Sequence, residues 1–131
     1  MKWREDYATG ITKIDDQHKM IFKMAEDYRE ALDEVQGARL YPEFLESLDL
    51  YAQGHFGFEE GCMLRYQCPA GRRNIAAHQE FVTALDGFRQ GYARDGFSEV
   101  VAYELVNTID LWLAEHICGI DVQLKRFVDQ G

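Results

Sequence analysis

Hydrophobic residues recur every three or four positions along four long stretches of the chain, with charged and polar residues between them. This period is typical of amphipathic helices. We predict helices over residues 14–35, 42–66, 72–91 and 98–118, and a short helical piece over 122–128. Gly37 should end the first helix, and Pro42 should open the second. Ser98 should cap the start of the fourth helix.

Four helices of five or six turns joined by short links predict an all-α, up-down-up-down antiparallel four-helix bundle, because short loops place consecutive helices antiparallel. We expect one domain over residues 1–131, since this length suits a single core. The first dozen residues, with Trp3 and Tyr7, should form an N-terminal arm packed on the bundle. The expected buried stripes include Val35, Ile75 and Val101.

The charge of the chain makes several partners improbable. Lys and Arg number 14 against 23 Asp and Glu, which gives a formal net charge of -9. An acidic protein is repelled by phosphate backbones and anionic lipid surfaces, so we expect neither nucleic acid nor membrane as a partner. The opening residues show no secretion signal, and no apolar run is long enough to span a bilayer. We expect a cytoplasmic monomer.

The cysteines indicate no disulfide framework. Cys62, Cys68 and Cys118 are an odd number and form no C-x-x-C pair, so neither a set of disulfides nor a thiolate zinc site is predicted. We expect reduced thiols, with Cys62 and Cys118 as small core residues.

All four histidines fall on the apolar faces of the predicted helices, one on each. They are His18, His55, His78 and His116. A single histidine on such a face is more often a hydrogen-bonded core residue than a ligand. Here two carboxylates accompany them. Glu59 is four residues after His55 and therefore lies on the same inward face, where an unpaired carboxylate would be costly. Asp121 follows His116 by five residues, and a bend near Gly119 would turn both inward.

Four imidazoles and two carboxylates inside a bundle need compensating positive charge, and one or two metal cations supply it most simply. Imidazole nitrogen suits iron, zinc or copper, and a carboxylate can bridge two metals. The set therefore favours a dinuclear centre. A ferritin-like site would need more Glu and a Glu-x-x-His spacing on two helices, which the chain lacks. A bundle that carries zinc or manganese without redox chemistry stays open.

The motifs resemble those of the hemerythrin family, and in particular its bacterial single-domain members. The matching segments are Trp3 to Ile11 in the arm, Ile14-Asp15-Asp16-Gln17-His18, His55-Phe56-Gly57-Phe58-Glu59, His78-Gln79-Glu80-Phe81 and Trp112-Leu113-Ala114-Glu115-His116 through Asp121. The resemblance implies two iron ions bridged by an oxo or hydroxo group, with dioxygen as the ligand. It implies that His18 and His55 hold one iron, that His78 and His116 hold the other, and that Glu59 and Asp121 bridge them.

One position departs from the family pattern. The family usually has a histidine four residues before the position of His78, and this chain has Asn74. An amide oxygen is a weaker iron ligand than imidazole, so Asn74 would either ligate weakly or orient a bound water. Leu113 and Ile117 flank His116 and are candidates for an apolar wall of the dioxygen pocket, although ordinary core packing would also explain them. Glu60 is expected to be a solvated neighbour of Glu59.

The function implied by the resemblance is dioxygen binding for storage, delivery or sensing, with an unidentified oxygen-accepting or redox partner. This would make the chain a binding protein and not an enzyme. The alternative is a di-iron oxidase or peroxidase, or a protein that reacts with peroxide or nitric oxide, because Asn74 replaces the usual fifth histidine. Thiolate ligation by Cys62 or Cys118 is a weaker possibility than burial of a small side chain.

Overall fold

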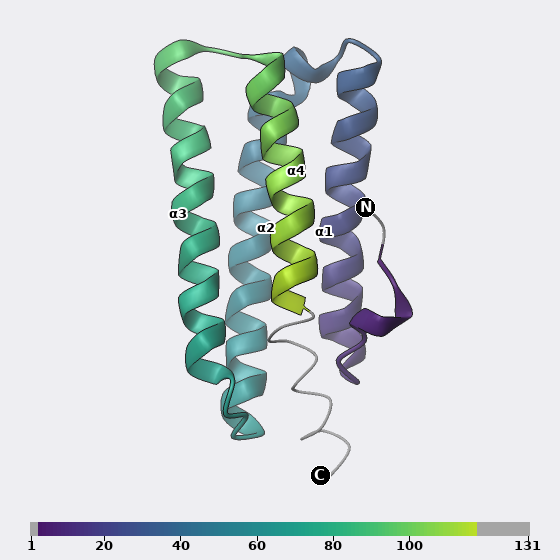
Figure 1. Cartoon of the computed structure of the whole chain (residues 1–131), viewed down its shortest axis with the longest axis vertical. Coiled ribbons are helices and arrows are strands. Elements are labelled where there is room, and N and C mark those ends of the chain that lie inside the picture. The colour runs from purple at the N-terminus through teal and green to yellow at the C-terminus, as the bar shows by residue number, and fades with distance from the viewer. Residues whose placement is uncertain (1–2, 118–131) are drawn as a thin grey trace.

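The described residues, 3–117 of the computed structural model, form helices and the loops between them. The four long helices are α1 (Thr12–Asp33), α2 (Gly37–Arg65), α3 (Gly71–Asp95) and α4 (Glu99–His116), and a 3-10 turn, η1 (Glu5–Tyr7), precedes them. Consecutive helices run in opposite directions, so the predicted up-down-up-down bundle is confirmed (Figure 1). The short C-terminal helix predicted over 122–128 lies outside the described residues.

The core is built from the stripes that the hydrophobic period predicts. Each helix turns one face inward, and α1 packs against both α2 and α4 while α3 packs against α2 and α4. The completely or almost completely buried apolar residues include Ile14, Ile21, Tyr41, Leu48, Met63, Leu105, Ile109 and Leu113. Among the described residues, no helix is long and apolar enough to cross a membrane.

The N-terminal arm packs on α1 as predicted. Tyr7 is buried and its ring stacks on Phe22 with the ring centroids 5.8 Å apart, and Trp3 meets Tyr7 edge-on at 6.5 Å. Thr9 donates to Asp15 Oδ1 from both its backbone N–H, at 2.8 Å, and its hydroxyl, at 2.9 Å. These bonds place the arm beside the start of α1 (Figure 1), and His18 lies in the second turn of that helix.

The link between α1 and α2 differs from the prediction. Val35 is 93% exposed and has a φ of 63°, so it lies beyond the end of α1 and outside the buried stripe. The second helix begins at Gly37, not at Pro42, which is exposed inside it. Gly37 packs so closely on Leu32 that a Cβ at this position would collide with that side chain. Its carbonyl accepts a 2.8 Å hydrogen bond from the Tyr28 hydroxyl, which ties α1 to the start of α2.

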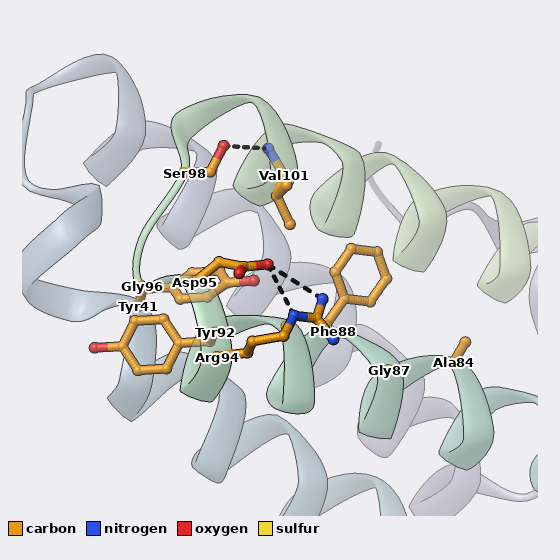
Figure 2. A pocket seen from close by; sticks show the side chains of 11 residues that line it. Tyr41, Ala84, Gly87, Phe88, Tyr92, Arg94, Asp95, Gly96, Ser98 and Val101 are labelled. Carbon is orange, nitrogen blue, oxygen red and sulfur yellow. Dashed lines mark hydrogen bonds and ion pairs between the residues drawn. The ribbon is translucent and has the colours of Figure 1, made fainter.

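The third helix also departs from the prediction in length and phase. It continues to Asp95, one turn past Gly91, and Gly96 with a φ of +78° then breaks it. Ile75, predicted to face inward, is 43% exposed, whereas the preceding Asn74 is fully buried. Val101 in α4, which was also predicted to be buried, is 38% exposed and lines a pocket between α3 and the start of α4 (Figure 2).

Candidate metal centre

The bundle brings its four histidines to one level. His18 lies in the second turn of α1 and His78 in the third turn of α3, whereas His55 lies late in α2 and His116 ends α4. Because the helices alternate in direction, early positions in α1 and α3 meet late positions in α2 and α4. All four side chains are buried, with at most 4% of each residue exposed.

Glu59 lies at the centre of these histidines, and each of its two oxygens faces a different pair. Oε2 lies 3.3 Å from His18 Nε2 and 3.5 Å from His55 Nε2. Oε1 lies 3.1 Å from His78 Nε2 and 3.4 Å from His116 Nε2. The carboxylate is fully buried. It therefore has the placement of a bridge between two positions, each bordered by two imidazoles.

The donor atoms fit metal cations. His18, His55 and Glu59 form one group, and Glu59, His78 and His116 form another, with the ligand atoms of each group within 4.8 Å of one another. Nε2 of His78 lies 3.1 Å from Nε2 of His116, so without a cation one of the two nitrogens must carry a proton and donate to the other, because two unprotonated nitrogens at that distance repel each other. A cation between them removes that conflict, and the mixed imidazole and carboxylate set is one that iron accepts.

Contacts of the Nδ1 atoms, on the side of the ring away from Glu59, fix the orientation of two of the imidazoles. His55 Nδ1 lies 2.7 Å from Gln17 Oε1, an oxygen that can only accept, so Nδ1 carries the proton and Nε2 is left free to bind a metal. His78 Nδ1 lies 3.3 Å from Glu60 Oε2 in the same way. The expectation that Glu60 is simply solvated is therefore wrong, because it is half-buried against a predicted ligand. Nothing in the spacing of Gln17 signals its contact with His55.

Aromatic rings stack on the two histidines that α3 and α4 contribute to the site. Phe56 stacks on His78 with ring centroids 3.9 Å apart, and Trp112 stacks on His116 at 4.4 Å. Leu113 and Ile117, the predicted wall residues, are 1% and 0% exposed. Their burial agrees with either an apolar wall or ordinary core packing.

Asn74 is buried on the same face of α3 as His78, one helical turn earlier. Neither its side-chain oxygen nor its side-chain nitrogen has a hydrogen-bond partner among the described residues. An unsatisfied buried amide costs about 1–3 kcal/mol. A metal ion, or a water held by one, is the kind of partner that would satisfy it.

Two predicted positions are not assessed by this geometry. Asp121 and Cys118 lie outside the described residues. Cys62 is half-buried and not a full core residue. Burial, and then the charge of Glu59, raise the pKa of its thiol, which keeps it protonated and disfavours a thiolate ligand.

Burial lowers the pKa of His55 to about 3, against the opposing effect of Glu59. A buried neutral imidazole becomes protonated when the chain unfolds, so below an unfolded pKa of about 6.5 the unfolded state binds more protons. We predict that the metal-free protein loses about 2 kcal/mol of unfolding free energy between pH 6.5 and pH 4.5 from this residue. Urea unfolding at several pH values measures it. A His55→Asn variant should show a weaker pH dependence, and an equal dependence would contradict the assignment.

Glu60 provides a second prediction. Removing the charge behind a metal-binding imidazole weakens metal binding, typically by 10–100-fold for such outer contacts. We expect Glu60→Ala to lower iron affinity by about tenfold or more, and Glu60→Gln by less, because its amide oxygen still accepts from Nδ1. Competition with an iron chelator measures the change. Glu80→Ala, at an exposed position of α3, is the control and should leave the affinity unchanged.

These features define a helical bundle with two groups of buried His and Glu side chains that are able to hold metal cations on either side of one carboxylate. The family model described as "Hemerythrin HHE cation binding domain" matches residues 9–128. The chain belongs to the hemerythrin family.

Named relatives agree with this assignment. A bacteriohemerythrin of Pseudomonas aeruginosa is 32% identical over 119 residues, which are 91% of this chain and 75% of that protein. A bacteriohemerythrin of Stenotrophomonas maltophilia is 29% identical over 128 residues, covering 98% and 79% of the two chains. A myohemerythrin of Theromyzon tessulatum is 26% identical over 124 residues, covering 95% and 90%. Membership of this family supports a di-iron protein that binds oxygen.

Proposed function

We propose that this chain binds dioxygen reversibly at a di-iron centre, for storage, delivery or sensing. The observation that carries the proposal is the position of Glu59, whose two oxygens each face a separate pair of histidines. In the proposed centre His18 and His55 hold one iron, and His78 and His116 hold the other. Glu59 bridges them, and Asp121 is proposed as a second bridge by resemblance to the family.

The side chains around the site suit this task. When bound, a pair of ferrous ions supplies the electrons that dioxygen needs to bind as a reduced ligand. The buried Leu113 and Ile117 would exclude water and admit a small neutral gas, while disfavouring the escape of charged products. Phe56 and Trp112 restrict the rings of His78 and His116 by stacking, so the ligand nitrogens stay aimed inward.

Quantitative iron analysis of protein purified without oxygen, followed by optical spectra in air, tests the proposal. We expect two irons per chain and a visible absorption band that appears in air and disappears when oxygen is removed. The zinc-loaded protein is the control and should show no such band. Protein that contains zinc or manganese and does not bind iron would contradict the proposal and support a metal site without redox chemistry.

A second candidate function rests on Asn74. Its buried amide has no hydrogen-bond partner among the described residues and stands where the family usually has a fifth histidine, which leaves the centre with fewer strong ligands. An open position on the second iron would favour irreversible oxidation, and reaction with peroxide or nitric oxide. Rapid mixing of the reduced protein with oxygen separates the two candidates. A long-lived, reversible band supports binding, whereas immediate oxidation together with peroxide consumption supports the enzyme.

A further inference from the structure

Two of the proposed ligands have partners of different charge at their Nδ1 atoms. The first iron is the one proposed between the histidines of α1 and α2, and the second iron is the one proposed between those of α3 and α4. At the first iron, His55 Nδ1 lies 2.7 Å from the amide oxygen of Gln17, which is neutral. At the second iron, His78 Nδ1 lies 3.3 Å from a carboxylate oxygen of Glu60, which is anionic. These two contacts therefore differ by one negative charge.

Solvent screens the charge of Glu60 only in part. Its side chain is 31% exposed and lies in a pocket between α2 and α3, whose lining also includes His78, Phe56, Ile75 and Val82. Phe56 stacks on the His78 ring with the ring centroids 3.9 Å apart, which restricts rotation of that ring away from Glu60. A charge beside apolar walls interacts more strongly with its surroundings than a charge in bulk water. The Glu60 carboxylate can therefore influence a metal bound at Nε2 of the same ring.

A carboxylate behind a metal-bound imidazole makes that imidazole a stronger donor. The Nδ1–H group donates to the carboxylate, and the ring becomes more basic at the nitrogen that binds the metal. A ferric ion gains more than a ferrous ion from a stronger donor and from a nearby negative charge, because it carries one more positive charge. The neutral amide of Gln17 has a smaller effect on His55. Glu60 therefore favours the ferric state of the second iron more than Gln17 favours that of the first.

We propose that Glu60 and Gln17 make the two irons electronically unequal, so that the second iron is oxidised first. In the singly oxidised centre, one electron has passed from the second iron to a one-electron oxidant, which leaves the second iron ferric and the first iron ferrous. This order requires the di-iron centre of the proposed function but not reversible binding of dioxygen. Both residues act through a histidine, so they are positioning residues and not ligands.

Stepwise oxidation of the oxygen-free diferrous protein with one-electron mediators tests the order. It gives two potentials, and the imidazole N–H resonances of the singly oxidised form show which histidines surround the ferric ion. In the parent protein we expect the ferric ion beside His78. Glu60→Gln keeps an acceptor of the same shape and removes the charge. It should favour the ferrous state of the second iron by about tenfold, or about 59 mV for one electron, since outer contacts typically change metal affinity by at least that factor.

Gln17→Glu makes the opposite change at the first iron and should favour the ferric state there by about tenfold. The double variant Q17E/E60Q has the same total charge as the parent protein. It should reverse the order of oxidation and place the ferric ion beside His55. Glu80→Gln and Gln90→Glu are the matched controls, because they make the same two chemical changes at exposed positions of α3. Both should leave the two potentials close to those of the parent protein.

Iron content and the absorption band formed in air are measured on the same samples, which separates this proposal from dioxygen binding. A double variant that keeps the ferric ion beside His78 would overturn the proposed order, and so would a Glu60→Gln protein with the potentials of the parent. Either result leaves dioxygen binding intact if the reversible band is present. If the parent holds two irons without a reversible band, dioxygen binding fails, whereas the potentials and N–H resonances still decide the order of oxidation.

Discussion

Glu59→Gln is expected to remove most of the bound iron while leaving the chain folded. The two oxygens of Glu59 face two pairs of imidazoles at 3.1–3.5 Å, and a glutamine would turn an N–H₂ group toward one pair. The amide also lacks the negative charge that offsets two cations. Since a ligand present at a thousand times its dissociation constant stabilises a protein by about 4 kcal/mol, the variant should lose iron-dependent stabilisation of that order.

The metal-free form should respond in the opposite sense. A buried carboxylate without a cation is costly, so its neutral replacement should leave the metal-free chain equally stable or more stable. Iron content per chain and urea unfolding with and without iron measure both effects. Glu46→Gln, an exposed change on the same helix, is the control. A Glu59→Gln protein that keeps two irons would contradict the bridging role.

Much of the fold follows from the hydrophobic period. Four apolar stripes and short links are enough to predict the bundle, because a helix with one apolar face must bury it against others. The errors lie at helix ends, where the period no longer applies. Val35 continues the stripe of α1 by spacing, yet the chain has already turned toward Gly37, whose position depends on a contact with Leu32 that is made only in the folded state.

The candidate site, like the fold, could be predicted from the sequence only in part. The inward histidines and Glu59 could be predicted because their helical phase places them in the core, and a buried carboxylate among imidazoles requires positive charge. The contacts of Gln17 and Glu60 join different helices, α1 to α2 and α2 to α3, and depend on the rotation of each helix. One sequence without the bundle geometry does not determine that rotation.

Asn74→His is expected to produce the second large change, because it restores the ligand type that the family usually has at this position. Asn74 is fully buried one turn before His78, so an imidazole there would face the same interior. A third imidazole on the second iron should slow iron loss to a chelator by about tenfold or more, since even outer contacts of a metal site change affinity by 10–100-fold. The band formed in air should also last longer, because the position open to further reaction is filled.

Asn74→Leu separates this effect from simple relief of an unsatisfied amide. Leucine has the same branched skeleton of four side-chain heavy atoms as asparagine, but it is larger and has no polar atoms. If the only effect of the buried amide is to destabilise the metal-free chain, leucine should stabilise that chain wherever its extra volume fits. It should not slow iron release, because it offers no ligand. If the histidine and leucine variants release iron at the same rate as the parent, Asn74 does not control the second iron position. The oxidase alternative would then lose the observation that favours it, and reversible dioxygen binding by four histidines would be the simpler account of the centre.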